Sequence, residues 1–281
     1  MTGPTGGQTD GPFRPGEPAW IELSSAEPAA AEVFYRGLLG WSVRHERLAS
    51  GTYRMCSVDG HDVAGIADAA LLHGSRPQGW ITYFAVADVA TTANRAVDLG
   101  GELLLAPRYL PDAGTGAAVI DPFGAVFGLY RGEARVGVES LNSIGALCWN
   151  ELSTGEPDGS VAYYRRLFGY ETDHRDSPTD HAYTVLTLED EPVAGVLELD
   201  NVWPNVLPAQ WIPYLRVASL SDAVDRVLSL GGSASMGPVA SPHGALHVVR
   251  DPEGHAFTLI ELESGLRQSR GHAGPHPTTG A

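Results

Sequence analysis

The first apolar and polar positions of the chain alternate as they do in a strand, over residues 20–24. From residue 29 to residue 38 the apolar positions change to a helical spacing, with Glu27-Pro28 opening the helix and Gly40 ending it. Three further strands are expected after this helix, at about 41–48, 52–58 and 61–67. The pattern therefore predicts a β-α-β-β-β unit.

The same order of elements follows directly. A strand is expected over 80–86 and a helix over 89–99, which Gly100 and Gly101 end. Strands at about 102–106, 116–120 and 125–130 complete the unit, with a turn at Asp121-Pro-Phe-Gly124 between the last two. Two β-α-β-β-β units thus fill the first half of the chain.

This whole arrangement occurs a second time. Equivalent residues recur at a constant offset, in the pairs Trp20/Trp149, Glu22/Glu151, Pro28/Pro157, Tyr35/Tyr164 and Gly40/Gly169. The chain is therefore a tandem duplication. We expect domains at 18–131 and 146–263, a linker at 132–145, and disordered tails rich in Gly and Pro at 1–17 and 264–281.

Composition limits the classes of molecule that the protein is expected to bind. The formal net charge of −16 disfavours nucleic acid and anionic lipid, because phosphate groups would be repelled. The chain has no apolar run long enough for a membrane span and no signal pattern at its first residues, so a cytoplasmic location is expected. Cys56 and Cys148 lack a paired spacing and are expected to be buried free thiols.

The ordered motifs of both copies resemble the vicinal oxygen chelate superfamily, which includes glyoxalases, bleomycin-resistance proteins and extradiol dioxygenases. The resemblance rests on the Glu-Pro after the first strand, on Phe34-Tyr35 and Leu39-Gly40-Trp41, on the Gly-Gly pair and on the Asp-Pro-x-Gly turn. It is strongest to the bacterial tandem, mycobacterial antigen type of glyoxalase-like protein. It implies an α+β fold, in which each domain pairs two βαβββ units into a curled mixed sheet around a cleft.

The resemblance also implies where metal ligands would stand. In metal-using members they are typically two histidines and a glutamate, and the matching positions here hold Trp20, Ile81 and Gly128, or Trp149, Ile212 and Thr258. These side chains are poor ligands for a divalent cation. We therefore expect no metal site and no cofactor.

Strand alternation indicates what fills the clefts instead. If Trp20 and Ile81 face the first cleft, then Glu22 and Tyr83 face it too. In the second copy the same rule adds Glu151 to Trp149, and it adds Tyr214 and Arg216 to Ile212. Further candidates are His247, whose strand can border the second cleft, and two equivalent wall tyrosines, Tyr53 and Tyr183.

Three roles remain open for the glutamates and tyrosines. Glu22 and Glu151 could tether backbone, with Tyr83 and Tyr214 as core residues. They could contact a ligand, or they could act as catalytic acids and bases, since burial among apolar side chains raises the pKa of a carboxyl group.

Two functions follow from these alternatives. The first is a protein, monomeric or homodimeric, that binds or sequesters an apolar or aromatic small molecule such as a metabolite or antibiotic. The second is a metal-free isomerase, lyase or cyclase, and a metal-dependent glyoxalase or dioxygenase is disfavoured. The second copy is expected to have the more polar cleft and to be the better candidate. It has Asn150, Arg216, His247 and His255 where the first has Ile21, Ala85, Ala117 and Ala125.

Overall fold

A computed structural model of the chain describes residues 13–48, 51–69, 79–110, 113–133, 135–175, 183–199 and 209–263. Most of the two expected tails, residues 1–12 and 264–281, lies outside this range. Residues 13–17, which composition assigns to the first tail, form backbone hydrogen bonds with the end of a strand. Gly16 N donates to Ala85 O at 2.7 Å, and Ala85 N donates to Glu17 O at 2.8 Å.

The first copy forms one curled sheet of eight strands, in the order β2-β3-β4-β1-β5-β8-β7-β6. Its two βαβββ units meet where β1 and β5 pair antiparallel, with Trp20 opposite Tyr83 and Glu22 opposite Ile81. The elements are β1 (Pro18–Ser25), α1 (Pro28–Leu39), β2 (Ser42–Leu48), β3 (Gly51–Val58), β4 (His61–Asp68), β5 (Gly79–Ala85), α3 (Val89–Asp98), β6 (Glu102–Leu110), β7 (Gly114–Ile120) and β8 (Val126–Gly132).

The second copy repeats this sheet in the order β10-β11-β12-β9-β13-β16-β15-β14. Its elements are β9 (Leu147–Thr154), α4 (Pro157–Phe168), β10 (Glu171–Arg175), β11 (Tyr183–Leu188), β12 (Glu191–Glu198), β13 (Gln210–Arg216), α5 (Leu220–Ser229), β14 (Ser233–Ser241), β15 (Gly244–Arg250) and β16 (Ala256–Leu262). The predicted fold class, α+β with tandem domains of paired βαβββ units, is confirmed.

The helices begin and end as their sequences predict. α1 and α4 start at Pro28 and Pro157, and each ends at a glycine with a left-handed backbone, φ 72° at Gly40 and 81° at Gly169. Glycine adopts this conformation without the steric cost that a Cβ imposes. In α3 the Asp88 side chain accepts from the backbone N of Thr91, and Ser219 caps α5 in the same way.

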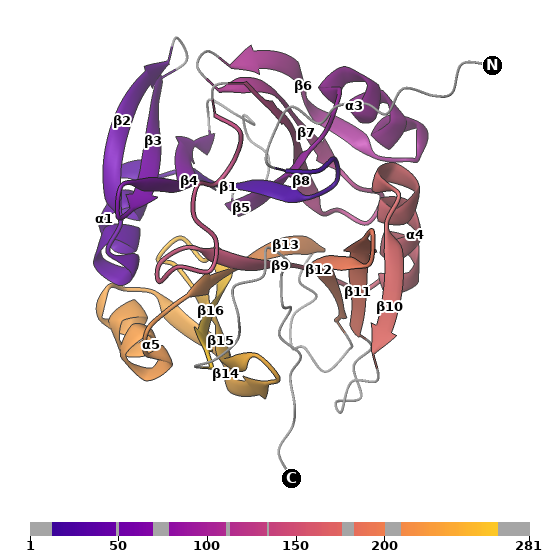
Figure 1. The fold of residues 1–281 in the computed structure, drawn as a ribbon. Helices are drawn as coiled ribbons and strands as arrows, with labels where there is room; N and C mark the ends of the chain where they lie inside the picture. The colour runs from indigo at the N-terminus through magenta and orange to yellow at the C-terminus, as the bar shows by residue number, and fades with distance from the viewer. Residues whose placement is uncertain are drawn as a thin grey trace, which may run out of the picture.

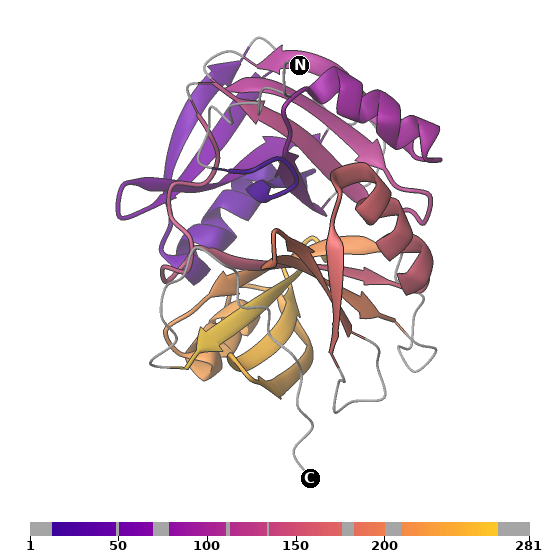
Figure 2. The same cartoon turned by 45° about the vertical axis from the view of Figure 1, so that its right-hand side comes forward.

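The two copies pack through the outer, helix-bearing faces of their sheets. Helix α1 of the first copy lies beside α5 of the second, and α3 lies beside α4 (Figure 1, Figure 2). One buried cluster joins α1 residues such as Phe34 to α5 and to Phe257, and a second joins Phe84 and α3 to α4 residues such as Leu167. The main apolar cores are therefore shared between the copies, and the concave faces point away from this interface.

A reciprocal hydrogen-bond chain crosses the interface twice. Trp80 Nε1 donates to the Tyr35 hydroxyl at 3.1 Å, and this hydroxyl donates to Asp251 Oδ2 of the other copy at 3.1 Å. The equivalent chain runs from Trp211 to Tyr164 and on to Asp121 of the first copy, with both steps at 2.9 Å. Each turn aspartate therefore has two roles. Its Oδ1 accepts from the backbone of its own turn, and its Oδ2 accepts from the tyrosine of the other copy.

Two sequence expectations can be compared with these coordinates. Cys56 and Cys148 are buried and form no disulfide with each other, as predicted. Within the described ranges, no helix combines the length and the apolar character that crossing a bilayer requires.

Removing either interdomain tyrosine hydroxyl should weaken the fold. Tyr35→Phe leaves the indole N–H of Trp80 without a partner, and Tyr164→Phe removes the partner of both the Trp211 indole N–H and Asp121 Oδ2, so each should lower the free energy of unfolding by about 1–3 kcal/mol. Asp251 Oδ2 keeps its contact with His255 Nδ1 at 3.0 Å, so Tyr35→Phe should be the milder change. Urea unfolding followed by circular dichroism measures this. Tyr109→Phe, on an exposed tyrosine, is the control and should change stability by less than about 0.5 kcal/mol. Equal stability of all three variants would contradict the interface described here.

Candidate functional site

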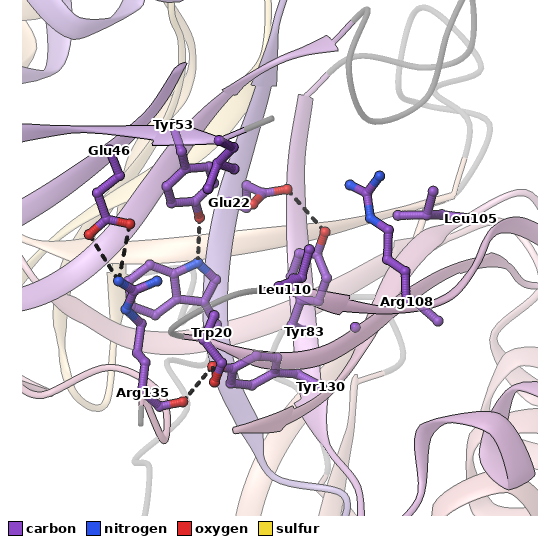
Figure 3. Close-up of a pocket in the computed structure, with 14 residues that line it drawn as sticks. Trp20, Glu22, Glu46, Tyr53, Tyr83, Leu105, Arg108, Leu110, Tyr130 and Arg135 are labelled. Carbon is purple, nitrogen blue, oxygen red and sulfur yellow. Dashed lines mark hydrogen bonds and ion pairs between the residues drawn. The ribbon is translucent and has the colours of Figure 1, made fainter. Parts of the chain in front are cut away.

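A pocket of about 80 Å³ opens on the concave face of the first sheet, which we call the first cleft. Strands β1 and β5 bring Trp20, Glu22 and Tyr83 to its floor, and β3 contributes Tyr53 (Figure 3). The edge strands β2 and β6 end at Leu48 and Leu110, which also line it. The predicted set of Trp20, Glu22, Tyr53 and Tyr83 is therefore brought together in one pocket, and Ile81 is buried in the same apolar cluster.

A chain of hydrogen bonds fixes the floor of this pocket. Trp20 Nε1 donates to the Tyr53 hydroxyl at 3.1 Å, and Tyr83 Oη donates to Glu22 Oε1 at 3.0 Å (Figure 3). Tyr53 also hydrogen-bonds to Glu22. Burial raises the pKa of both tyrosines well above the usual value, so both hydroxyls keep their protons and act as donors. The indole ring and Glu22 are consequently held in fixed orientations.

Glu22 is subject to opposing electrostatic effects. Burial raises the pKa of its carboxyl group, and the hydrogen bonds from Tyr53 and Tyr83 together with the positive charge of Arg108 act in the opposite direction. Burial prevails, so the pKa lies above its ordinary value. The first cleft thus contains one acid whose protonation is sensitive to whatever enters beside it.

Two glycines make room for the tyrosines. A Cβ built on Gly65 would lie 1.8 Å from the Tyr53 hydroxyl, and one on Gly128 would lie 2.0 Å from the Tyr83 ring. Each ring therefore lies directly against the backbone of the neighbouring strand. At Gly128 this packing also uses the position that the resemblance assigns to the third metal ligand.

Four charged or aromatic pocket residues are absent from the sequence-based list: Glu46, Arg108, Tyr130 and Arg135. Arg135 comes from the predicted linker, donates to Glu46 at 3.0 and 3.2 Å, and lies 6.0 Å from the centre of the Trp20 ring. Arg108 lies on β6, which continues to Leu110 and not to about 106 as predicted. Charged residues in a segment taken as a loop gave no signal of a cleft.

The second cleft is built from the equivalent residues. Trp149 Nε1 donates to the Tyr183 hydroxyl at 3.0 Å, and Glu151 accepts hydrogen bonds from Tyr214 and Tyr183. Burial raises the pKa of Glu151 to about 7, and no arginine counteracts this effect. Ile212 belongs to the same buried cluster as Trp149.

Two substitutions distinguish the clefts. Across β6 and β7 of the first copy Arg108 faces Gly116, whereas at the equivalent place in the second copy Val239 faces Leu246. Gly116 lines the open pocket, but Leu246 and Val239 are packed into the apolar cluster around Trp149. Side chains therefore occupy in the second cleft the space that is left open in the first.

The expectation that the second cleft is the more polar is wrong, because the polar residues that suggested it lie elsewhere. His247 pairs with Leu259, which is in the interdomain core, so its side chain points to the outer face and not into the cleft. Asn150 accepts from Thr82 across the interface at 2.8 Å, and His255 bonds to Asp251 in its turn.

Arg216, expected in the second cleft, is used at the end of β13. It shares a face with Tyr214, but its Nη1 donates to the backbone O of Asn142 at 2.6 Å and so anchors the linker. The remaining candidates of the second cleft, Glu151, Tyr183, Ile212 and Tyr214, lie together around Trp149 as predicted.

The residues at the implied metal positions do not fit a cation. The indole of Trp20, the sec-butyl side chain of Ile81 and Gly128, which the Tyr83 ring covers, offer no ligand atoms in the first cleft. Within the described ranges, no group of three His, Cys, Asp or Glu side chains is arranged to hold a metal ion. The side chains at these positions therefore provide no ligand set for a divalent cation.

Comparison with known proteins agrees with the duplication. The profile of the family described as "Glyoxalase-like domain" matches residues 20–130 and 149–260. CFP32 of Mycobacterium tuberculosis, named as a glyoxylase, is 30% identical over 256 residues, which are 89% of this chain and 96% of that protein. The anthracycline biosynthesis protein DauV of Streptomyces sp. strain C5 is 31% identical over 269 residues, 89% of this chain and 94% of that protein.

A solved structure shows the same fold. The Mn(II)-bound glyoxalase from Novosphingobium aromaticivorans superposes with a TM-score of 0.61 at 14% identity, over 89% of this chain and 83% of that one.

Glu151 should make the protein less stable as the pH rises from about 4.5 to about 7. Over this range the carboxyl group keeps its proton in the folded chain and loses it in the unfolded chain, so rising pH favours unfolding. Glu151→Gln resembles the protonated form at every pH. It should match the wild type at about pH 4 and exceed its free energy of unfolding by on the order of 3 kcal/mol at about pH 8.

Chemical denaturation at a series of pH values measures the difference between wild type and variant. Glu191→Gln, on an exposed glutamate of the same domain, serves as the control and should follow the wild type throughout. A Glu151→Gln curve parallel to the wild type would show that this carboxyl group titrates normally.

Proposed function

Since this chain belongs to the glyoxalase-like domain family, with both copies matched, we propose that it binds a largely apolar aromatic metabolite or antibiotic in its first cleft. The main observation behind this proposal is the open pocket over Trp20. In the second copy the Leu246 side chain packs at the equivalent place. An indole face and three tyrosine rings favour a planar aromatic ligand, and Glu22 can orient its polar groups. The proposed role is binding without metal.

The relatives support an aromatic ligand class. Two Streptomyces proteins, each 31% identical to this chain, are named for anthracycline biosynthesis. The pocket of about 80 Å³ would take one end of such a ring system. The remainder would extend past Leu48 and Leu110, at the ends of the two edge strands.

Filling the first cleft should abolish binding. Gly116→Leu introduces the side chain that the second copy carries, and its Cβ would meet nothing closer than Leu110 at 3.3 Å. The variant should therefore fold, yet bind an anthracycline aglycone at least about tenfold more weakly than wild type. Calorimetry measures the affinity, and quenching of tryptophan fluorescence gives an independent reading.

Leu246→Ala is the matched control for that experiment. It removes volume from the second cleft and leaves the first untouched, so it should bind the aglycone as wild type does. Binding lost in Leu246→Ala and retained in Gly116→Leu would assign the ligand to the second cleft. The absence of binding to the wild type would remove aromatic polyketides of this kind as the ligand.

Proton transfer by Glu22 is the second candidate function. The observation that favours it is a buried carboxyl group with raised pKa, 3.0 Å from a tyrosine hydroxyl and beside an open pocket. Such a pair could remove a proton next to a carbonyl group and return it elsewhere, as an isomerase or lyase requires. The second cleft has the same pair, and among the described residues Leu246 packs with Trp149 and Tyr214 in one buried cluster.

Exchange of carbon-bound hydrogen tests this candidate. With α-tetralone in deuterated water, wild type should speed the loss of the α-proton signal in NMR spectra, and Glu22→Gln should remove at least about 90% of that acceleration. Glu151→Gln is the control and should exchange as fast as wild type. If Glu22→Gln exchanges at the wild-type rate, Glu22 is not a base and the binding function alone remains.

A further inference from the structure

Among the described residues that line the pocket, only Arg108 has a buried side-chain donor without a hydrogen-bond partner. Its Nε is buried and has no hydrogen-bond partner among the described residues. Leaving such a donor unpaired is costly, more so on a charged group than on a neutral one. The other arginine of the pocket differs, because Arg135 is bonded to Glu46 at 3.0 Å. Figure 3 shows Arg135 beyond Trp20 and Arg108 at the opposite end of the pocket, near the Glu22–Tyr83 pair.

The scaffold does not need an arginine at this place. The second copy has the same sheet, the same Trp-Tyr-Glu-Tyr constellation and the same strand pairing, with Val239 at the position of Arg108. There Val239 packs with Leu246 in a filled cleft, whereas Arg108 accompanies the opening at Gly116. The arginine therefore goes with the open pocket and not with the fold.

The charges that face the pocket favour a neutral occupant. Glu46 and Arg135 form an ion pair, and Arg108 is the positive charge that acts on Glu22. A neutral ligand leaves this balance intact. An anionic ligand beside Glu22 would raise the pKa of that carboxyl group further, and the overall charge of −16 would oppose the approach of an anion.

We infer that Arg108 is the specificity-determining residue of the first cleft and that it donates to the carbonyl oxygen of a neutral aromatic ketone or quinone. This inference rests on the proposed binding function and adds the functional group that the ligand carries. The ring lies against the Trp20 and Tyr130 side of the pocket. The carbonyl oxygen accepts from the guanidinium where Arg108 lines the pocket.

Three small probes of one shape test the inference: tetralin, α-tetralone and tetralin carboxylate. They differ only in having no polar group, a neutral carbonyl oxygen or an anion. Wild type should bind α-tetralone about tenfold or more tightly than tetralin, as measured by NMR titration. In Arg108→Leu this preference should fall to about one, while tetralin binds as well as before or better. Arg108→Lys should keep part of the preference, since one donor remains.

Each result decides between the alternatives. Retention of tetralin binding shows that the Arg108→Leu cleft is still formed, so loss of the ketone preference alone supports the inference. A preference for α-tetralone that persists in Arg108→Leu overturns it. Tighter binding of the carboxylate than of the ketone by wild type also overturns it, because the site would then be an anion site. Equal binding of tetralin and α-tetralone to wild type keeps the proposed function and rejects the inference, and no binding of any probe rejects both.

Discussion

The packing of the two copies through their outer faces determines where this molecule can bind a ligand. Tyr35 and Tyr164 each cross the interface to the turn aspartate of the other copy, and each is held by a tryptophan of its own copy. Buried polar chains of this kind require one relative position, because a shift would leave several groups unpaired. The helices and outer faces therefore pack into the interface, and the open pocket lies on a concave face.

Duplication allows one scaffold to keep its structural role twice while the concave faces diverge. The interdomain contacts are nearly symmetric, so substitution there is constrained from both sides. Position 116 and its equivalent 246 lie outside that constraint. A glycine at one and a leucine at the other change a filled apolar core into a pocket without altering the strand pairing. In the second copy the equivalent residues belong to a buried apolar cluster.

Periodicity and repetition were sufficient to predict the elements and the duplication. The resemblance to the superfamily supplied the fold class and placed Trp20 in the cleft, and strand alternation then added Glu22 and Tyr83. They were insufficient for Arg108, because β6 extends beyond its apolar residues, and for Arg135, because a linker residue has no face to assign. The misplacement of His247 had a different cause. This histidine was placed by its strand, which can border the cleft, and no face of that strand was assigned; its pairing with Leu259 puts it on the outer face. Comparing the copies position by position would also have exposed the Gly116 and Leu246 difference.

The centre of each cleft holds a buried glutamate, and the two copies differ in the groups that compensate its negative charge. In the second copy Glu151 receives two tyrosine donors and no positive charge, and its pKa rises to about 7. In the first copy Glu22 also has two tyrosine donors, and the positive charge of Arg108 acts on it as well. Burial of an ionised carboxylate requires such compensation, and protonation is the alternative. The arginine therefore offsets the acid from the side on which the pocket opens, so a ligand that accepts from Arg108 necessarily alters the environment of Glu22 as well.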